Sequence, residues 1–257
     1  MIRFLEILSA GYLPFMSFVF GAVFGSFCNA WAWRICHEEK ITDGRSHCPR
    51  CGHTLAAKDL VPLLSWLLLK GRCRYCKAPI SPRYIAAEAV LGLYFLSIYL
   101  IYGLSWTCLR LLILGCLLLI CSLTDLETME LPDAMLIAAA AAALLRLTEP
   151  GGWKSALIGC FAVSAPLLLV VLVMDRILKK ETMGGGDIKL TAVLGLHFGA
   201  PKTLLLLILA CLLGLAGAAL QKKKPDVRFP FGPMLSGAGW IVALIGEPVI
   251  GWYMGLF

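Results

Sequence analysis

The sequence predicts an all-α polytopic membrane protein. Of its 257 residues, 60% are hydrophobic and 15% are charged, against roughly 25% charged residues in an ordinary soluble domain. The mean hydropathy is +0.83. Long unbroken apolar runs exclude a membrane-spanning β-barrel, whose strands alternate apolar and polar residues. The class that remains is a bundle of transmembrane helices.

Polar residues and helix breakers separate eight apolar runs. The first has 27 uncharged residues, enough to cross a bilayer and too long for the apolar core of a signal peptide. Residues 102–105 predict a short turn, Asp125 and Pro132 lie in an acidic loop, and three glycines lie at 184–186. We therefore expect about eight transmembrane helices, several shorter than usual. The runs cover residues 7–33, 89–109, 111–124, 134–145, 155–174, 190–199, 203–220 and 232–257.

The basic residues fall mainly on one side of this arrangement. If the loops 34–84, 125–133, 175–189 and 221–231 share a side, that side carries 18 of the 23 Lys and Arg residues, and the other carries 5. Cytoplasmic loops of membrane proteins are enriched in these residues. The bias places the four loops in the cytoplasm and both termini outside. It also accounts for the net charge of +7 without a nucleic-acid partner.

The loop 34–84 contains two pairs of cysteines with the spacing of a metal site. Cys48 and Cys51 form one CxxC pair, and Cys73 and Cys76 form another after 21 intervening residues. Each pair can direct two thiolates at one ion, and four cysteines complete the tetrahedral coordination of a structural zinc. The alternatives are two disulfides, which need an oxidising compartment, or four bystander thiols. Because the charge bias places this loop in the cytoplasm, we predict a zinc site with four cysteine ligands.

Two aspartates lie at the ends of apolar runs. Asp125 follows the run 111–124, and Asp187 follows the glycines at 184–186. Ionisable groups at membrane depth are costly and are functional candidates by default. Two carboxyls brought together from separate helices are what an aspartyl protease needs, one to activate water and one to polarise the scissile carbonyl. Each residue also has a simpler interpretation, Asp187 as a helix N-cap and Asp125 as a polar residue that ends a span.

The environment of the two carboxyls predicts different protonation states. Asp187 leads into a helix, whose N-terminal amides favour an anion, and Lys189 lies close to it in sequence. Asp125 ends a helix, where the partial negative charge disfavours an anion. We therefore expect Asp125 to hold the proton of the pair and Asp187 to be ionised. Asp133 follows a proline and is interpreted as an N-cap, not as a catalytic residue.

These motifs resemble those of the bacterial type IV prepilin peptidases, bifunctional leader peptidase/N-methyltransferases of the GxGD class of membrane aspartic proteases. The resemblance covers nearly the whole chain, and no motif position departs from the family pattern. It is carried by residues 25–29 (GSFCN) with Arg34, the cysteine loop with Asp59, Pro62 and Ser65-Trp66, residues 79–84 (PISPRY) with Glu88, Asp125 with residues 131–133 (LPD), residues 184–190 (GGGDIKL), and residues 230–233 (PFGP).

The resemblance implies an activity and assigns residues to it. The substrates would be type IV prepilins or pseudopilins, cut on the cytoplasmic side of their hydrophobic helix after a leader that ends in glycine. The new N-terminal residue would then be methylated with S-adenosylmethionine as the methyl donor. In this family the cysteine loop is linked to the methyltransferase. The implied residues are the catalytic pair Asp125 and Asp187, the supporting loop residues Gly184, Gly186 and Lys189, and the methyltransferase candidate Gly71.

The expected chain has three parts and two rival interpretations. The parts are a first transmembrane helix in 1–33, a cytoplasmic zinc module in 34–84 and a membrane-embedded peptidase core in 85–257. We expect the protein in the bacterial inner membrane, in contact with the lipid bilayer and with prepilin substrates. One rival is a GxGD protease that cuts helices deep in the bilayer, and the other is a transporter whose aspartates bind ions. The zinc loop and the position of both aspartates at span ends argue against these rivals.

Overall fold

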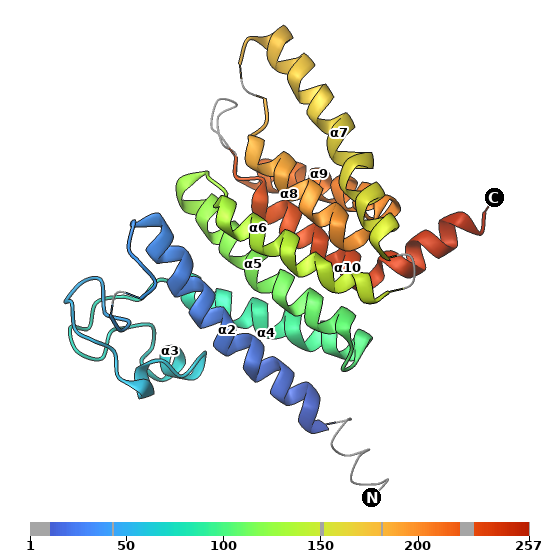
Figure 1. The fold of residues 1–257 in the computed structure, drawn as a ribbon. Coiled ribbons are helices and arrows are strands. Elements are labelled where there is room, and N and C mark those ends of the chain that lie inside the picture. Colours follow the sequence, from blue (N-terminus) through green and yellow to red (C-terminus); the bar gives the residue numbers. More distant parts are fainter. Residues whose placement is uncertain (1–10, 43, 150–151, 181, 222–228, 257) are drawn as a thin grey trace, which may run out of the picture. The chain divides into compact units, whose positions relative to one another are not determined.

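The computed structural model (Figure 1) describes residues 11–42, 44–149, 152–180, 182–221 and 229–256. In these ranges the regular structure is helical and contains no strand. The chain divides into two compact units, Met1–Gly103 and Leu104–Phe257. The start of the predicted first helix at 7–10 and the basic residues at 222–228 lie outside the described residues.

The N-terminal unit is built on a close pair of antiparallel helices, α2 (Leu13–Cys36) and α4 (Pro82–Tyr102). A Cβ atom at Gly21 would lie 2.5 Å from the carbonyl oxygen of Leu91, and one at Gly25 would lie 2.8 Å from that of Ala87. Glycines four residues apart let two helix backbones approach closely, as they do in membrane helix pairs. The spacing Gly21-x-x-x-Gly25 is therefore the reason that these two helices pack so tightly.

Between these helices the chain forms the cysteine loop, with the 3-10 helix η2 (Ala57–Asp59) and the short helix α3 (Leu64–Leu68). Helix α4 begins earlier than the apolar run that predicted it. Ser81 starts the helix, because its hydroxyl accepts a hydrogen bond from the amide of Arg83 (3.3 Å) and Pro82 follows it. The predicted turn at 102–105 is present, since α4 ends at Tyr102 and Gly103 has a φ of +56°.

The C-terminal unit contains the remaining helices, with α5 the most buried of the long ones. Helix α5 packs against α6 and α10, and α7 packs against α8 through Gly159 and Gly195, where the backbones touch. Beyond Pro166, α7 presents mostly exposed apolar side chains, and Figure 1 shows this half extending past its neighbours. The elements are α5 (Trp106–Thr128), α6 (Asp133–Ala142), η3 (Ala143–Thr148), α7 (Gly152–Leu178), α8 (Gly185–Phe198), α9 (Ala200–Gln221) and α10 (Gly232–Met254).

Within the described ranges, six helices are long and apolar enough to cross a membrane, namely α2, α4, α5, α7, α9 and α10. The other two predicted spans coincide with α6 and α8, which have 10 and 14 residues. At 1.5 Å per residue these helices are ~15 and ~21 Å long, less than the ~30 Å of a bilayer core. A multi-pass helical membrane protein is thus confirmed, and the count of eight crossings stays a prediction.

Two arginines donate hydrogen bonds to the last carbonyl groups of α8. Arg110 of α5 donates to the carbonyl oxygen of His197 (2.7 Å), and Arg146 of η3 donates to that of Leu196 (3.0 Å). The His197 ring lies between Arg110 and the carbonyl oxygen of Ala139, so its Nε2 donates to that carbonyl (2.9 Å) and its Nδ1 accepts. Cations at a helix C-terminus complement the helix dipole. These contacts let a short helix end inside the bundle.

Replacing Gly21 with valine should disrupt the α2–α4 pair. A branched side chain would meet the backbone of Leu91 and the side chain of Phe95 at less than contact distance. Overpacking of this kind costs roughly 1–3 kcal/mol, so we expect a lower thermal midpoint for the detergent-solubilised protein. Gly11→Val is the matched control, because nothing lies within 4 Å of a Cβ atom there. Equal midpoints for the two variants would contradict the packing argument.

Candidate active site and zinc centre

The two CxxC pairs form the same type of turn. In the first, the amide of Gly52 donates to the carbonyl oxygen of Cys48 (2.8 Å), and in the second, the amide of Lys77 donates to that of Cys73 (3.0 Å). Gly52 and Lys77 both have a left-handed backbone, with φ of +69° and +60°. One isolated β-bridge closes each turn. The chain therefore presents two equivalent knuckles, each carrying two thiols.

The four sulfur atoms of Cys48, Cys51, Cys73 and Cys76 lie within 4.8 Å of one another. Sulfur ligands of a tetrahedral zinc are about 3.8 Å apart, given Zn–S bonds of about 2.3 Å, so the cluster fits zinc with a small contraction. All four thiols are free. Amide hydrogen bonds from Cys76 and Tyr75 lower the pKa of the Cys73 thiol to about 7, while burial and the neighbouring sulfurs raise the pKa of Cys76 to about 11, so without a metal Cys73 ionises before Cys76. The predicted cluster is confirmed, and its geometry is compatible with zinc.

Asp59 links the two halves of the cysteine loop. Its carboxylate accepts hydrogen bonds from the guanidinium of Arg74 (2.6 Å), the hydroxyl of Tyr75 (3.1 Å) and the amide of Ala56 (3.2 Å). The bond from Arg74 is the main reason that the pKa of Asp59 lies below its usual value. Glu88 of α4 in turn accepts the amide of Leu63 (2.7 Å). Asp59 thus joins two segments of the cysteine loop, and Glu88 joins the loop to α4.

Gly71 sits where a side chain does not fit. Its φ is +66°, and a Cβ atom would lie 2.8 Å from the indole ring of Trp66. Its amide donates to the carbonyl oxygen of Trp66 (2.9 Å), and its own carbonyl accepts from Ile80 (2.7 Å). The structure therefore gives Gly71 a conformational role beside the second knuckle.

Asp125 is buried in the C-terminal unit, and its side chain is held by a neighbouring helix. The residue is 6% exposed and lies inside α5, which continues to Thr128. Its Oδ2 accepts a hydrogen bond from the amide of Gly232 (2.8 Å), the first residue of α10. The simpler interpretation, a polar residue that merely ends a span, does not account for this burial and this partner.

The N-terminal end of α8, which carries Asp187, borders Leu131. A Cβ atom at Gly186 would lie 3.1 Å from Leu131, and one at Gly232 would lie 2.9 Å from Asp125 Oδ2 and 3.3 Å from Leu131. Leu131 is thus enclosed by the N-terminal ends of α8 and α10, and the carboxyls of Asp125 and Asp187 are within electrostatic range of each other. The structure brings together the two aspartates that the sequence singles out.

The N-terminal ends of α6 and α8 correct two expectations. The N-cap of α8 is Gly184, and Asp187 is its third residue, so the N-cap interpretation of Asp187 is wrong. Asp133 is the first residue of α6 and makes no capping bond. Its carboxylate instead pairs with the ammonium of Lys189 (2.7 Å). The supporting loop residue Lys189 therefore binds Asp133 and ties α6 to α8.

The structure adds a contact that bears on which of the two carboxyls holds the shared proton. The expectation that Asp125 holds it rests on the C-terminal end of α5 and on the acidic loop that follows, which has Glu127, Glu130 and Asp133 and no basic residue. The amide of Gly232, at the positive end of α10, donates directly to Asp125 and favours its anion. The end of α5 and the start of α10 thus act on Asp125 in opposite directions, and the protonation assignment stays a prediction.

Sequence reasoning missed the role of Gly232. The motif at 230–233 was visible in the sequence, but its partner Asp125 is 107 positions away in the chain. A hydrogen bond between the hydroxyls of Ser122 and Ser236 (2.9 Å) joins the same two helices. Ser236 lies one turn after Gly232, and Ser122 lies one turn before Asp125. Two serines in otherwise apolar helices were the signal in the sequence that could have revealed this pairing.

Comparison with known families divides the chain near Gly103, where the two compact units also meet in sequence. A model of the bacterial peptidase A24 N-terminal domain matches residues 19–102, and a model of the type IV leader peptidase family matches residues 112–219. The chain belongs to the type IV leader peptidase family. As a member of this family it is a membrane aspartic peptidase.

Several curated relatives of this peptidase carry the same name, prepilin leader peptidase/N-methyltransferase. The protein of Aeromonas hydrophila is 36% identical over 83% of this chain and 76% of its own length. The protein of Neisseria gonorrhoeae is 30% identical over 97% of both chains. That of Bacillus subtilis (strain 168) is 33% identical over 92% of this chain and 96% of its own length. No solved structure matches the chain.

Replacing one cysteine of the cluster should release its metal. We expect Cys48→Ser in the purified full-length peptidase to lose bound zinc, measured as metal per chain, because three thiolates and a hydroxyl bind zinc more weakly than four thiolates. Cys211→Ser is the matched control, since Cys211 is a free, exposed cysteine of α9 outside the cluster. Wild-type protein without zinc, or with intact Cys–Cys bridges, would refute the site.

Proposed function

We propose that this peptidase removes the leader of type IV prepilins and pseudopilins at the cytoplasmic membrane face and then methylates the new N-terminus with S-adenosylmethionine. The proposal takes its substrate class and second activity from the names of the relatives. The observation that supports the peptidase part is that the starts of α8, which carries Asp187, and of α10, which holds Asp125, both border Leu131.

The proposed reaction uses the two carboxyls as one acid–base unit. The ionised carboxyl takes a proton from a water molecule, whose oxygen attacks the scissile carbonyl carbon, while the protonated carboxyl donates to the carbonyl oxygen. Collapse of the tetrahedral intermediate breaks the C–N bond, and the amine leaves with a proton returned from the pair. Because two nearby carboxyls cannot readily both ionise, they share one proton before the reaction. The amide of Gly232 orients Asp125 for this task.

The surroundings of the pair support cleavage at an aqueous face. The side chains of Lys189 and Asp133 are 59% and 65% exposed, and their ion pair lies at the same helix ends as Asp187. We place these ends in the cytoplasm, with eight crossings and both termini outside, on the distribution of Lys and Arg. A substrate whose cleavage site lies just outside its apolar helix could present it there. The Lys189–Asp133 ion pair beside the carboxyls favours this arrangement over a protease that cuts deep in the bilayer.

The cysteine cluster fits a zinc ion, whereas the cavity beside it does not fit the methyl donor. Cys48, Cys51, Cys73 and Cys76 fit a structural zinc, which would hold the module 34–84 in shape. S-adenosylmethionine would supply an electrophilic methyl group. The cavity beside the second knuckle does not fit it, because three cations line this cavity and no acidic group is present to match the sulfonium and amino groups. We retain Gly71 as the candidate residue for methyl transfer through the shape it gives to the loop.

We keep the three-part functional division, 1–33, 34–84 and 85–257, as a proposal. The compact units divide the chain at Gly103 instead, because α4 packs on α2. The contacts define how the chain folds, and the proposed boundaries define which segment anchors, which binds zinc and which cleaves.

Asp125→Asn and Asp187→Asn should each abolish leader removal. An asparagine side chain cannot act as the general base or the general acid, and the reaction needs both carboxyls. The measurement is processing of a co-expressed prepilin, followed as a shift in its mass. Glu130→Gln is the control, because this exposed carboxylate follows α5 in the acidic loop. Near-normal processing by either Asn variant, with zinc and membrane insertion intact, would disprove the assignment.

Gly232→Ala should reduce leader removal at least tenfold without loss of the protein. The added methyl would lie 2.9 Å from Asp125 Oδ2 and 3.3 Å from Leu131, and misplacement of a catalytic group by about 1 Å can cost 100-fold in rate. Gly237→Ala, one and a half turns along α10, is the matched control, because the nearest atom there is 3.8 Å away. Equal activity of the two variants would show that the Gly232 contact does not position Asp125.

A further inference from the structure

The zinc module of the N-terminal unit carries an exposed apolar face. In α3, Leu64, Leu67 and Leu68 are 58%, 56% and 80% exposed. Trp66 of the same helix turns the other way, towards Gly71 and Ile80. Soluble loops seldom expose three neighbouring leucines, and such a face marks a surface that meets another apolar phase.

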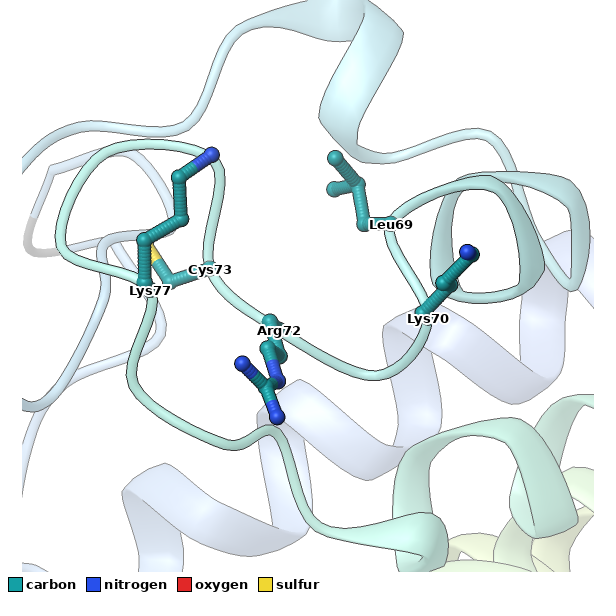
Figure 2. Close-up of a pocket in the computed structure, with 5 residues that line it drawn as sticks. All are labelled: Leu69, Lys70, Arg72, Cys73 and Lys77. Atoms are coloured by element: carbon teal, nitrogen blue, oxygen red, sulfur yellow. The ribbon is translucent and has the colours of Figure 1, made fainter.

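Directly after this face, the chain curves around a basic cavity. The cavity has a volume of about 410 Å³. It is lined by Leu69, Lys70, Arg72, Cys73 and Lys77, which Figure 2 labels. Lys70, Arg72 and Lys77 are exposed, and none forms an ion pair within the described part of the chain. Arg74, by contrast, is bound to Asp59. Lys70, Arg72 and Lys77 thus give this part of the loop three exposed cations beside the leucines of α3, a combination that favours an anionic surface.

Lys77 occupies a backbone position that is better suited to glycine. The first knuckle has Gly52 at the equivalent place, and both residues have positive φ. Residues other than glycine are strained at positive φ because their Cβ atom crowds the backbone. The second knuckle thus keeps a charged side chain at the rim of the cavity where the backbone alone would favour glycine.

We propose that this surface, formed by Leu64, Leu67, Leu68, Lys70, Arg72 and Lys77, rests on the bilayer and binds the phosphate of an anionic phospholipid. Leucines beside lysine and arginine are the composition of segments that lie in the membrane interface, where the apolar side chains enter the acyl boundary and the cations meet headgroups. The loop also leaves α2 and returns to α4, two helices long and apolar enough to span a membrane. A bilayer is therefore present at both ends of the loop. A soluble anion would use the cations and leave the leucines exposed.

The test measures amide hydrogen exchange in residues 60–77 of the full-length, zinc-loaded protein in nanodiscs. One set contains phosphatidylcholine alone, and the other contains phosphatidylcholine with phosphatidylglycerol. We expect exchange to be at least tenfold slower with the anionic lipid, because each cation near a charged surface contributes roughly fivefold to association. The variant Lys70→Gln/Arg72→Gln/Lys77→Gln should lose this protection, and Leu64→Ser/Leu67→Ser/Leu68→Ser should lose it with all charges in place.

The matched control is Lys40→Gln/Arg50→Gln/Lys58→Gln, which removes three exposed charges of the same loop outside the cavity. Protection retained in this control and lost in the two test variants supports the site. Equal exchange in both lipids, or equal loss in the control, would overturn it. So would unchanged lipid protection in the cavity variant with methylation lost, because the cavity would then serve a soluble substrate or cofactor. Zinc content, measured for every variant, verifies that the knuckles remain folded.

Discussion

A carboxyl group buried among apolar helices has to find its hydrogen-bond donor inside the protein, and Asp125 imposes this condition on the C-terminal unit. The donor is a backbone amide, so α10 has to begin at Gly232, beside the last turns of α5. Phe229 and Phe231, just before α10, pack on glycines of α9 and fix where the helix starts. The position of one side chain in α5 is thus set by the start of a helix that lies 107 positions later in the chain.

The same condition explains how α8 carries Asp187 although it is short. A helix that ends inside an apolar bundle leaves carbonyl groups that water cannot reach, and each unsatisfied group costs several kcal/mol. Arg110 and Arg146 satisfy the last carbonyls of α8, and Glu149 is paired with both arginines. One end of α8 is thus held by buried charges. The other end presents a carboxyl to the site.

The sequence was sufficient to predict features that depend on local composition and spacing. The apolar runs predicted helices, and the CxxC spacing predicted a four-sulfur cluster. The sequence was insufficient for features that depend on contacts between residues far apart in the chain. Nothing near Asp133 in the chain shows that its partner is Lys189, and nothing near Asp125 points to Gly232. Helix α4 also extends through Arg83 and Glu88, because Ser81 and Pro82 start it before the apolar run begins.

The close packing of α2 and α4 has a consequence for the loop that they frame. Because the pair is antiparallel and held together at Gly21, Gly25 and Gly92, the last turn of α2 lies beside the first turn of α4. Both ends of the cysteine loop are therefore tethered, which gives the loop an effective concentration near its anchor in the mM range. Contacts too weak to recruit a free domain are then sufficient to hold this one, and they remain weak enough to be released rapidly when another ligand competes for the same surface.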